Sequence, residues 1–65
     1  MHVFFFLLAM AEVYLKEGDN EYSKGETNNA VHFYSEGLQV NCKDVKLNAK
    51  LYSNRAAAQL LLGKN

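Results

Sequence analysis

The sequence predicts an all-α protein made of three helices. Three observations point to this class. The chain contains no proline, so helices can run without interruption. Apolar residues recur at spacings of three and four, which is the period of one face of an α-helix. No segment alternates strictly between apolar and polar residues over more than a few positions, as a half-buried strand would.

The first helix is expected over residues 3–24. Its first half, from Val3 to Met10, is apolar on all sides, and its second half mixes charged and apolar residues. The apolar run also resembles a short secretory signal peptide, although no basic residue precedes it. A bilayer span needs about 20 residues, which is far more than this run provides. We therefore expect residues 1–11 to extend the helix, with a signal peptide and peripheral membrane attachment as less favoured alternatives.

The second helix is expected over residues 30–40. The stretch "KGETNN" at 24–29 breaks the first helix with a glycine and then offers Thr27, Asn28 and Asn29, all suitable N-cap residues. From Ala30 to Val40 the apolar side chains fall on one helical face. These features predict an amphipathic helix of about three turns.

The third helix is expected from Val45 to Leu62. Asp44, at the end of the turn-like stretch "NCKD", is placed to cap it, and Gly63 ends it. Its apolar residues form two stripes, which predict contacts on two sides of the helix. The first stripe is Val45, Ala49, Tyr52 and Ala56, and the second is Leu47, Leu51, Ala58 and Leu62.

Length and composition narrow the possible functions. A chain of 65 residues is one small domain or part of one, and its 49% hydrophobic content favours a packed core. Seven basic and seven acidic residues cancel, so we expect no nucleic-acid binding. Cys42 is the single cysteine, which excludes an internal disulfide and fits a reducing compartment. We expect the cytoplasm, with the nucleus as a second compartment and the secretory pathway less favoured.

No pattern of residues indicates catalysis, a metal or a cofactor. His32 and Glu36 lie four apart on a helix, but a structural zinc ion takes four ligands. Cys42 lacks a matched histidine partner for nucleophilic chemistry. Gly63-Lys64 lacks the upstream glycine of a phosphate-binding loop. We therefore expect no enzyme activity, no cofactor and no metal site.

Two stretches carry a family resemblance: "FYSEGL" at 33–38 and "LYSNRAAA" at 51–58. Together with Ala30 and Tyr34, which form an A-x-x-x-F/Y pattern, they make the chain similar to tetratricopeptide repeat proteins of the co-chaperone type. The repeat is a helix–turn–helix unit of about 34 residues. The resemblance implies an antiparallel helical hairpin at 12–41, the first repeat unit, and the first helix of a second, incomplete unit at 42–65. Cys42 takes the place of the usual inter-repeat proline and is expected to be a small packed residue.

The register of the first helix against the repeat pattern has two solutions. The family's usual glycine followed by asparagine appears here as Gly18-Asp19-Asn20. We prefer the register that sets Asn20 and Tyr22 on the pattern and leaves Asp19 in the glycine position. The alternative register sets Gly18 on the pattern; Ala30 then follows at the right distance, but Tyr22 is out of phase.

The resemblance also implies a peptide-binding site. Co-chaperones of this family hold the C-terminal carboxylates of heat-shock chaperones that end in Glu-Glu-Val-Asp. They use a lysine and an asparagine on one helix and an asparagine on the next, and by resemblance these are Lys16, Asn20 and Asn54. Lys16 and Asn20 share a helix face at a spacing of four. The family's further lysine and arginine belong to a third unit that this sequence does not contain, so we expect weak binding.

Two functional hypotheses follow. Repeats are stabilised by their neighbours, and about three are normally needed for a stable array. A chain with about one and a half repeats is expected to be a fragment that is marginally stable or self-associating. It is either a protein-interaction module with a partial carboxylate clamp, or a structural helical fragment that forms homo-oligomers through exposed apolar faces.

Overall fold

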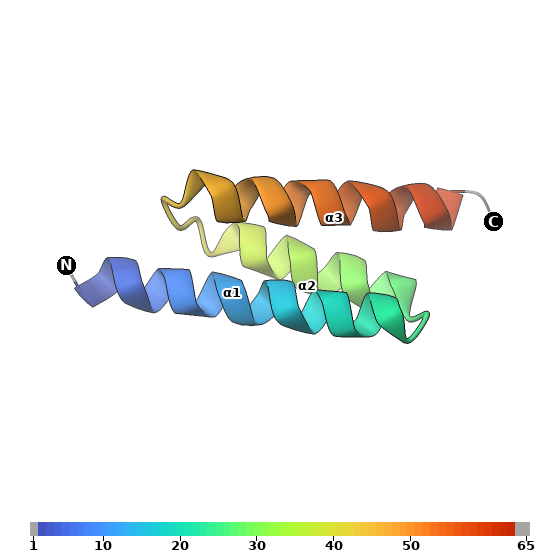
Figure 1. Cartoon of the computed structure of the whole chain (residues 1–65), viewed down its shortest axis with the longest axis horizontal. Coiled ribbons are helices and arrows are strands. Elements are labelled where there is room, and N and C mark those ends of the chain that lie inside the picture. Colours follow the sequence, from blue (N-terminus) through green and yellow to red (C-terminus); the bar gives the residue numbers. More distant parts are fainter. Residues whose placement is uncertain (1, 64–65) are drawn as a thin grey trace.

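The computed structural model describes residues 2–63, which form three helices: α1 (His2–Ser23), α2 (Thr27–Gln39) and α3 (Val45–Gly63). Figure 1 shows that α2 runs back along α1 and that α3 runs in the same direction as α1. The three helices form an elongated bundle of 44 × 18 × 14 Å. This architecture confirms the prediction of an all-α hairpin followed by one further helix.

The turn between α1 and α2 depends on Gly25, whose φ of +82° lies in the left-handed region. The Glu26 amide donates to the Glu21 carbonyl oxygen at 2.9 Å, and the Gly25 amide donates to the Tyr22 carbonyl oxygen at 3.0 Å. This pair of bonds is the Schellman motif, which satisfies the last carbonyl groups of a helix. Gly25 therefore ends α1, as a glycine without Cβ can do at little steric cost.

The start of α2 differs from the prediction. We expected it at Ala30, with Thr27, Asn28 or Asn29 as the cap, but α2 begins at Thr27 and Glu26 holds the capping position. Glu26 makes no side-chain capping hydrogen bond. The hairpin turn ends early because the Schellman motif reverses the chain within residues 24–26, directly after Ser23. The three polar residues are consequently part of the first helical turn.

The connection from α2 to α3 is fixed by two polar side chains. The carboxylate of Asp44 accepts a hydrogen bond from the Leu47 amide at 2.9 Å, which confirms the predicted cap of α3. The side-chain amide of Asn48 donates to the Cys42 carbonyl oxygen at 2.8 Å. Cys42 itself is buried, as expected for a packed residue in the position between repeats.

The core lies where α2 packs against both other helices. Tyr34 and Leu51 are the largest fully buried side chains, and buried alanines surround them. Gly37 lies so close to α3 that a Cβ there would come within 2.8 Å of a Leu51 methyl group. Small residues at such points allow the helix backbones to approach closely. The core is formed by Ala11, Ala30, Tyr34, Cys42, Leu47, Leu51 and Ala58.

Helix α3 buries one of its two apolar stripes. Leu47, Leu51 and Ala58 of the second stripe face the core. Residues of the first stripe are exposed, and Val45 retains 80% of its accessible surface. The prediction of contacts on two sides of α3 is therefore wrong within residues 2–63, because α2 and α1 both lie on the same side of α3.

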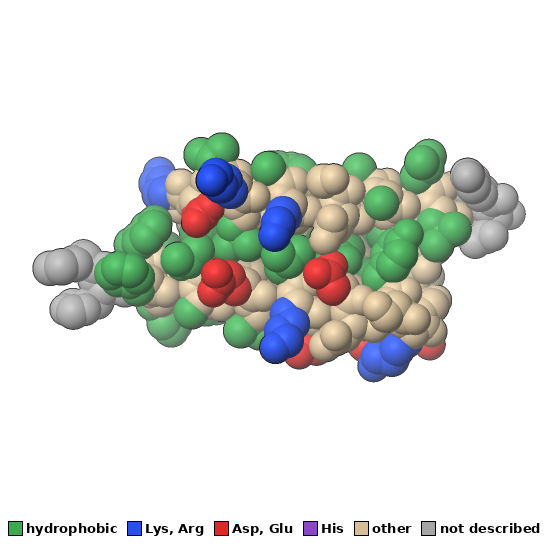
Figure 2. Space-filling view, viewed as in Figure 1, with side chains coloured by type: hydrophobic (Ala, Val, Ile, Leu, Met, Phe, Trp, Pro, Cys, Tyr) green, Lys and Arg blue, Asp and Glu red, His purple; other side chains and the backbone are tan. Residues whose placement is uncertain are grey.

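The apolar segment at the start of the chain is part of α1. Leu7 and Leu8 pack against the core, whereas Phe5 and Phe6 are 64% and 63% exposed. Figure 2 shows apolar side chains gathered at this end of α1. Among the described residues, none of the helices combines the length and apolar character that crossing a membrane requires.

Candidate functional site between α1 and α3

The register of α1, which is the alignment of its residues with the repeat pattern, is set by Gly18 and not by Asn20. Gly18 is buried, and a Cβ at this position would lie 2.6 Å from Cδ1 of Tyr34, which leaves no room for any side chain. Asp19 is exposed and therefore does not occupy the small-residue position. The preferred register from the sequence is consequently wrong by one residue, and the alternative with Gly18 on the pattern is the one that the structure adopts.

Asp19 is the residue at which all three helices meet. One oxygen of its carboxylate, Oδ1, accepts a hydrogen bond from the Tyr34 hydroxyl of α2 at 2.6 Å. The same oxygen accepts a hydrogen bond from the side-chain amide of Asn54 on α3 at 3.0 Å. Asp19 thus links the first helix of the hairpin to α2 and to α3.

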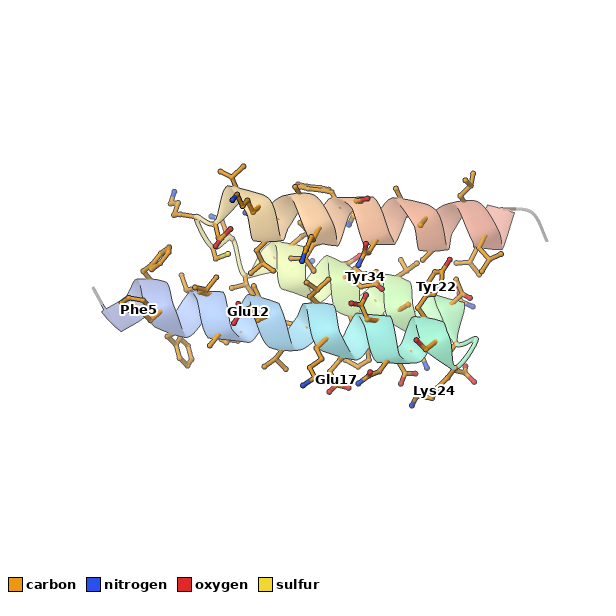
Figure 3. All side chains as sticks on the ribbon, viewed as in Figure 1. Phe5, Glu12, Glu17, Tyr22, Lys24 and Tyr34 are labelled. Atoms are coloured by element: carbon orange, nitrogen blue, oxygen red, sulfur yellow. The ribbon has the colours of Figure 1, made fainter. Side chains whose placement is uncertain are left out.

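A hollow of about 310 Å³ opens beside this carboxylate. Figure 3 shows Tyr22 and Tyr34 on the side of α1 that faces α3, where the hollow lies. Its lining combines one carboxylate, hydroxyl groups, an amide and a methyl group. The lining residues are Asp19, Tyr22, Ser23, Tyr34, Asn54 and Ala57.

Of the three predicted peptide-binding residues, Asn54 alone lines this hollow. Lys16 and Asn20 are exposed, and within residues 2–63 neither side chain makes a hydrogen bond or ion pair. Asn54 is brought together with Asp19 and not with Asn20. The spacing from Gly18 to Ala30, which fits the repeat pattern, was the signal in the sequence that could have identified Asp19.

The shift of register changes which residues occupy the family's clamp positions. The asparagine that usually follows the glycine is replaced by Asp19, and the lysine four residues earlier is replaced by Leu15. Leu15 is half-buried and packs against the core. The α1 side of the site therefore offers an apolar side chain and an anion, where the resemblance implies a cation and an amide donor.

The carboxylate of Asp19 affects the pKa of its hydrogen-bond partner Tyr34. Burial of the ring, and then the hydrogen bond to Asp19, raise the pKa of Tyr34, so its hydroxyl stays protonated and continues to donate.

The basic residues near the site contact other groups. Lys24 forms an ion pair with Glu21 at 2.8 Å, and Arg55 donates to the Ser35 hydroxyl at 3.2 Å. Hydrogen bonding to Lys24 lowers the pKa of Glu21.

A second hollow of about 310 Å³ lies on α1 and is almost wholly apolar. Its lining residues are Phe6, Ala9, Met10, Val13 and Tyr14. In the described part of the chain, no group of three or more His, Cys, Asp or Glu side chains is arranged to hold a metal ion.

A helical hairpin followed by a third helix that repeats the direction of the first, with glycine and alanine where the helices meet, defines a helical repeat protein. Tetratricopeptide repeat protein 4 of Mus musculus is 49% identical over 53 residues, which cover 82% of this chain and 14% of the mouse protein. The human protein of that name is 47% identical over the same length. The Hsp70/Hsp90 co-chaperone CNS1 of Saccharomyces cerevisiae is 42% identical over 53 residues. The chain belongs to the tetratricopeptide repeat family.

The chain spans 14% of the length of each of these relatives. No family model matches it, and no solved structure is significantly similar to it. The family assignment depends on these relatives together with the repeat architecture described above.

Proposed function

We propose that the chain is a protein-interaction module of the co-chaperone type, with chaperones of the Hsp70 and Hsp90 classes as partners. The name of the yeast relative, Hsp70/Hsp90 co-chaperone CNS1, supports this choice of partner. The observation that carries the proposal is the hollow between α1 and α3, where polar side chains of three helices converge at Asp19. Such a convergence of polar groups in a concave site is typical of a binding site.

A titration of the chain with purified Hsp70 and Hsp90 tests this proposal. Ala57 lines the hollow, whereas its exposed neighbour Ala56 does not. Ala57→Leu fills the hollow and is expected to weaken binding, while the matched variant Ala56→Leu retains it. The absence of saturable binding by the wild-type chain, or equal binding by both variants, would contradict the proposal.

Binding of a Glu-Glu-Val-Asp peptide through Lys16, Asn20 and Asn54 stays a prediction. In the register that places Gly18 on the pattern, an incoming carboxylate meets Leu15 and the negative charge of Asp19. Like charges within a few ångströms repel, so we expect the isolated peptide to bind weakly. Calorimetric titration of the peptide into Lys16→Ala, with the exposed Lys46→Ala as the control, measures the contribution of Lys16.

Self-association is the second candidate function. The exposed Phe5 and Phe6, next to the apolar hollow on α1, form a surface that a second copy of the chain can cover. Sedimentation over a range of concentrations tests it. The double variant Phe5→Ser, Phe6→Ser is expected to shift the chain toward the monomer. Val45→Ser, at a still more exposed apolar residue on α3, is expected to leave the oligomeric state unchanged.

A further inference from the structure

We propose that the Asp19 hollow binds a basic side chain, lysine or arginine, of a partner protein instead of a terminal carboxylate. The inference rests on the proposed function, because it assumes that the partner is a protein. The family resemblance implies a negatively charged carboxylate as the ligand at this position, whereas this inference assigns a positively charged one.

The first argument is the identity of the polar groups in the hollow. Asp19 contributes a carboxylate, and no Lys or Arg is among the lining residues. Its Oδ1 atom already accepts from Tyr34 and Asn54, whereas Oδ2 receives no hydrogen bond from the residues at 2–63. An ionised carboxylate accepts through both oxygens, so an incoming ammonium or guanidinium donor finds an available acceptor.

The second argument is that neighbouring cations are held elsewhere. Lys24 forms an ion pair with Glu21, which is the ion pair found within residues 2–63. Arg55 follows Asn54 on α3, but its guanidinium donates to Ser35 and lies 5.5 Å from the centre of the Tyr52 ring. The charge of Asp19 is therefore not compensated by a side chain of the described chain.

The third argument is that Asp19 already occupies one of the two side-chain N–H donors of Asn54. Asn54 gives its side-chain N–H to Asp19 at 3.0 Å. A peptide carboxylate that accepts the second N–H of Asn54 would lie beside the charge of Asp19, which repels it. A cation needs no donor from Asn54 and is attracted by the same charge.

Size and shape agree with a single long side chain. A volume of about 310 Å³ is at the lower end of the range of about 300–1,000 Å³ for small-ligand sites. Tyr22, which is 39% exposed, lines the hollow, and an aromatic ring attracts cations in addition to packing against an aliphatic stem.

The experiment uses four peptides with blocked ends: acetyl-Gly-Gly-X-Gly-Gly-amide with X as lysine, arginine, glutamate or norleucine. Binding to the full chain is followed by the NMR shifts of the Asn54 side-chain amide. The lysine and arginine peptides are expected to give shifts that grow with peptide concentration, although the binding is weak, because an exposed ion pair contributes little to affinity. The glutamate and norleucine peptides are expected to give none.

Asp19→Asn and Glu17→Gln form the matched pair of variants, since each removes one negative charge from α1. Figure 3 shows Glu17 on the side of α1 that faces away from α3. Asp19→Asn is expected to weaken binding of the lysine peptide about threefold or more, and Glu17→Gln to leave it unchanged. Circular dichroism checks whether each variant has retained its helices.

Equal binding of the lysine and glutamate peptides, or equal affinities of the two variants, would overturn the inference. If chaperone binding persists while the lysine peptide shows no preference, the inference alone fails. If the lysine peptide binds through Asp19 and the chaperones do not bind, the proposed function fails and the basic-side-chain site stands.

Discussion

Gly18 on α1 lies directly against the ring of Tyr34 on α2. A Cβ at residue 18 would approach Cδ1 of that ring to 2.6 Å, closer than side-chain carbons come in folded proteins. This contact determines how α1 is rotated, and the rotation in turn places Asp19 in front of Asn54 at 3.0 Å. One small residue therefore decides which side chains of α1 face the hollow.

Gly18→Ala is expected to destabilise the chain by about 1–3 kcal/mol, because the added methyl group overpacks a contact that has no free space. Chemical denaturation measures the loss. Gly63→Ala is the matched control, since a Cβ at that position meets nothing within 4 Å. An equal stability of the two variants would show that the Tyr34 ring can move away freely.

The free energy of unfolding is expected to fall in alkaline solution because Tyr34 loses its proton. Its pKa is raised above the usual value of 10.0 by burial and by the bond to Asp19, so the native state keeps the proton after the unfolded chain has lost it. The resulting stabilisation is fully present below about pH 10 and is lost as the pH rises toward the native pKa. The free energy of unfolding measured against pH should therefore decline above about pH 10.

Tyr34→Phe is expected to reduce the decline of the free energy of unfolding in alkaline solution. Tyr52→Phe, at an exposed tyrosine, is expected to leave this decline unchanged. Part of the slope remains in both variants, because hydrogen bonding to Glu21 raises the pKa of Lys24 as well. Tyr34→Phe also removes the hydrogen bond to the Asp19 carboxylate, which costs about 1.5–3 kcal/mol for a bond to a charged group. An unchanged pH profile in this variant would mean that the hydroxyl ionises freely in the native state.

Restoring the clamp residues at positions 15 and 19 is expected to create carboxylate binding. Leu15→Lys with Asp19→Asn supplies a cation and an amide donor at the family's spacing of four. Each charge-assisted hydrogen bond contributes about 1.5–3 kcal/mol, so affinity for a Glu-Glu-Val-Asp peptide should rise about tenfold or more. Isothermal titration calorimetry measures the gain.

The control for that experiment is Val13→Lys with Glu17→Gln, which makes the same chemical changes at the same spacing on a different face of α1. Lys16 and Asn20 remain in both double variants. A comparable gain in the control would indicate general charge attraction and would contradict the register with Gly18 on the pattern.

Loss of the Asp44 cap is expected to weaken the start of α3. Asp44→Ala leaves the Leu47 amide without its side-chain acceptor and should cost about 1 kcal/mol, within a range of about 0.5–2 kcal/mol. Asp44→Ser, which can still cap, should lose less. Hydrogen exchange at the Leu47 amide is the local measurement, and an unchanged exchange rate in Asp44→Ala would argue against the cap.

Much of the fold was predictable because its signals are local. The glycine and polar residues between helices, the apolar period and the position of Asp44 before an apolar run each act within one or two helical turns. The start of α2 was misplaced by three residues, since a Schellman motif at Gly25 ends the turn sooner than residue preferences for capping suggest.

The site was predictable in part. Asn54 was found through the motif around it, but Asp19 and Tyr34 were missed as partners. Asn20 and Tyr22 match the repeat pattern by residue type. Residue type alone distinguishes poorly between two registers that differ by one position. The fit of Gly18 against Tyr34 is a contact between residues 16 positions apart, so it appears only when α1 and α2 are packed.

The sequence by itself determined the three helices, the turns between them and the family of repeat proteins to which they belong, because helix formation and capping depend on neighbours along the chain. The tertiary structure alone decided which face of α1 meets α3, and with it the presence of a carboxylate instead of an amide at the centre of the site. A rotation of one residue turns a helix by about 100°, and close packing between helices is what chooses among such rotations.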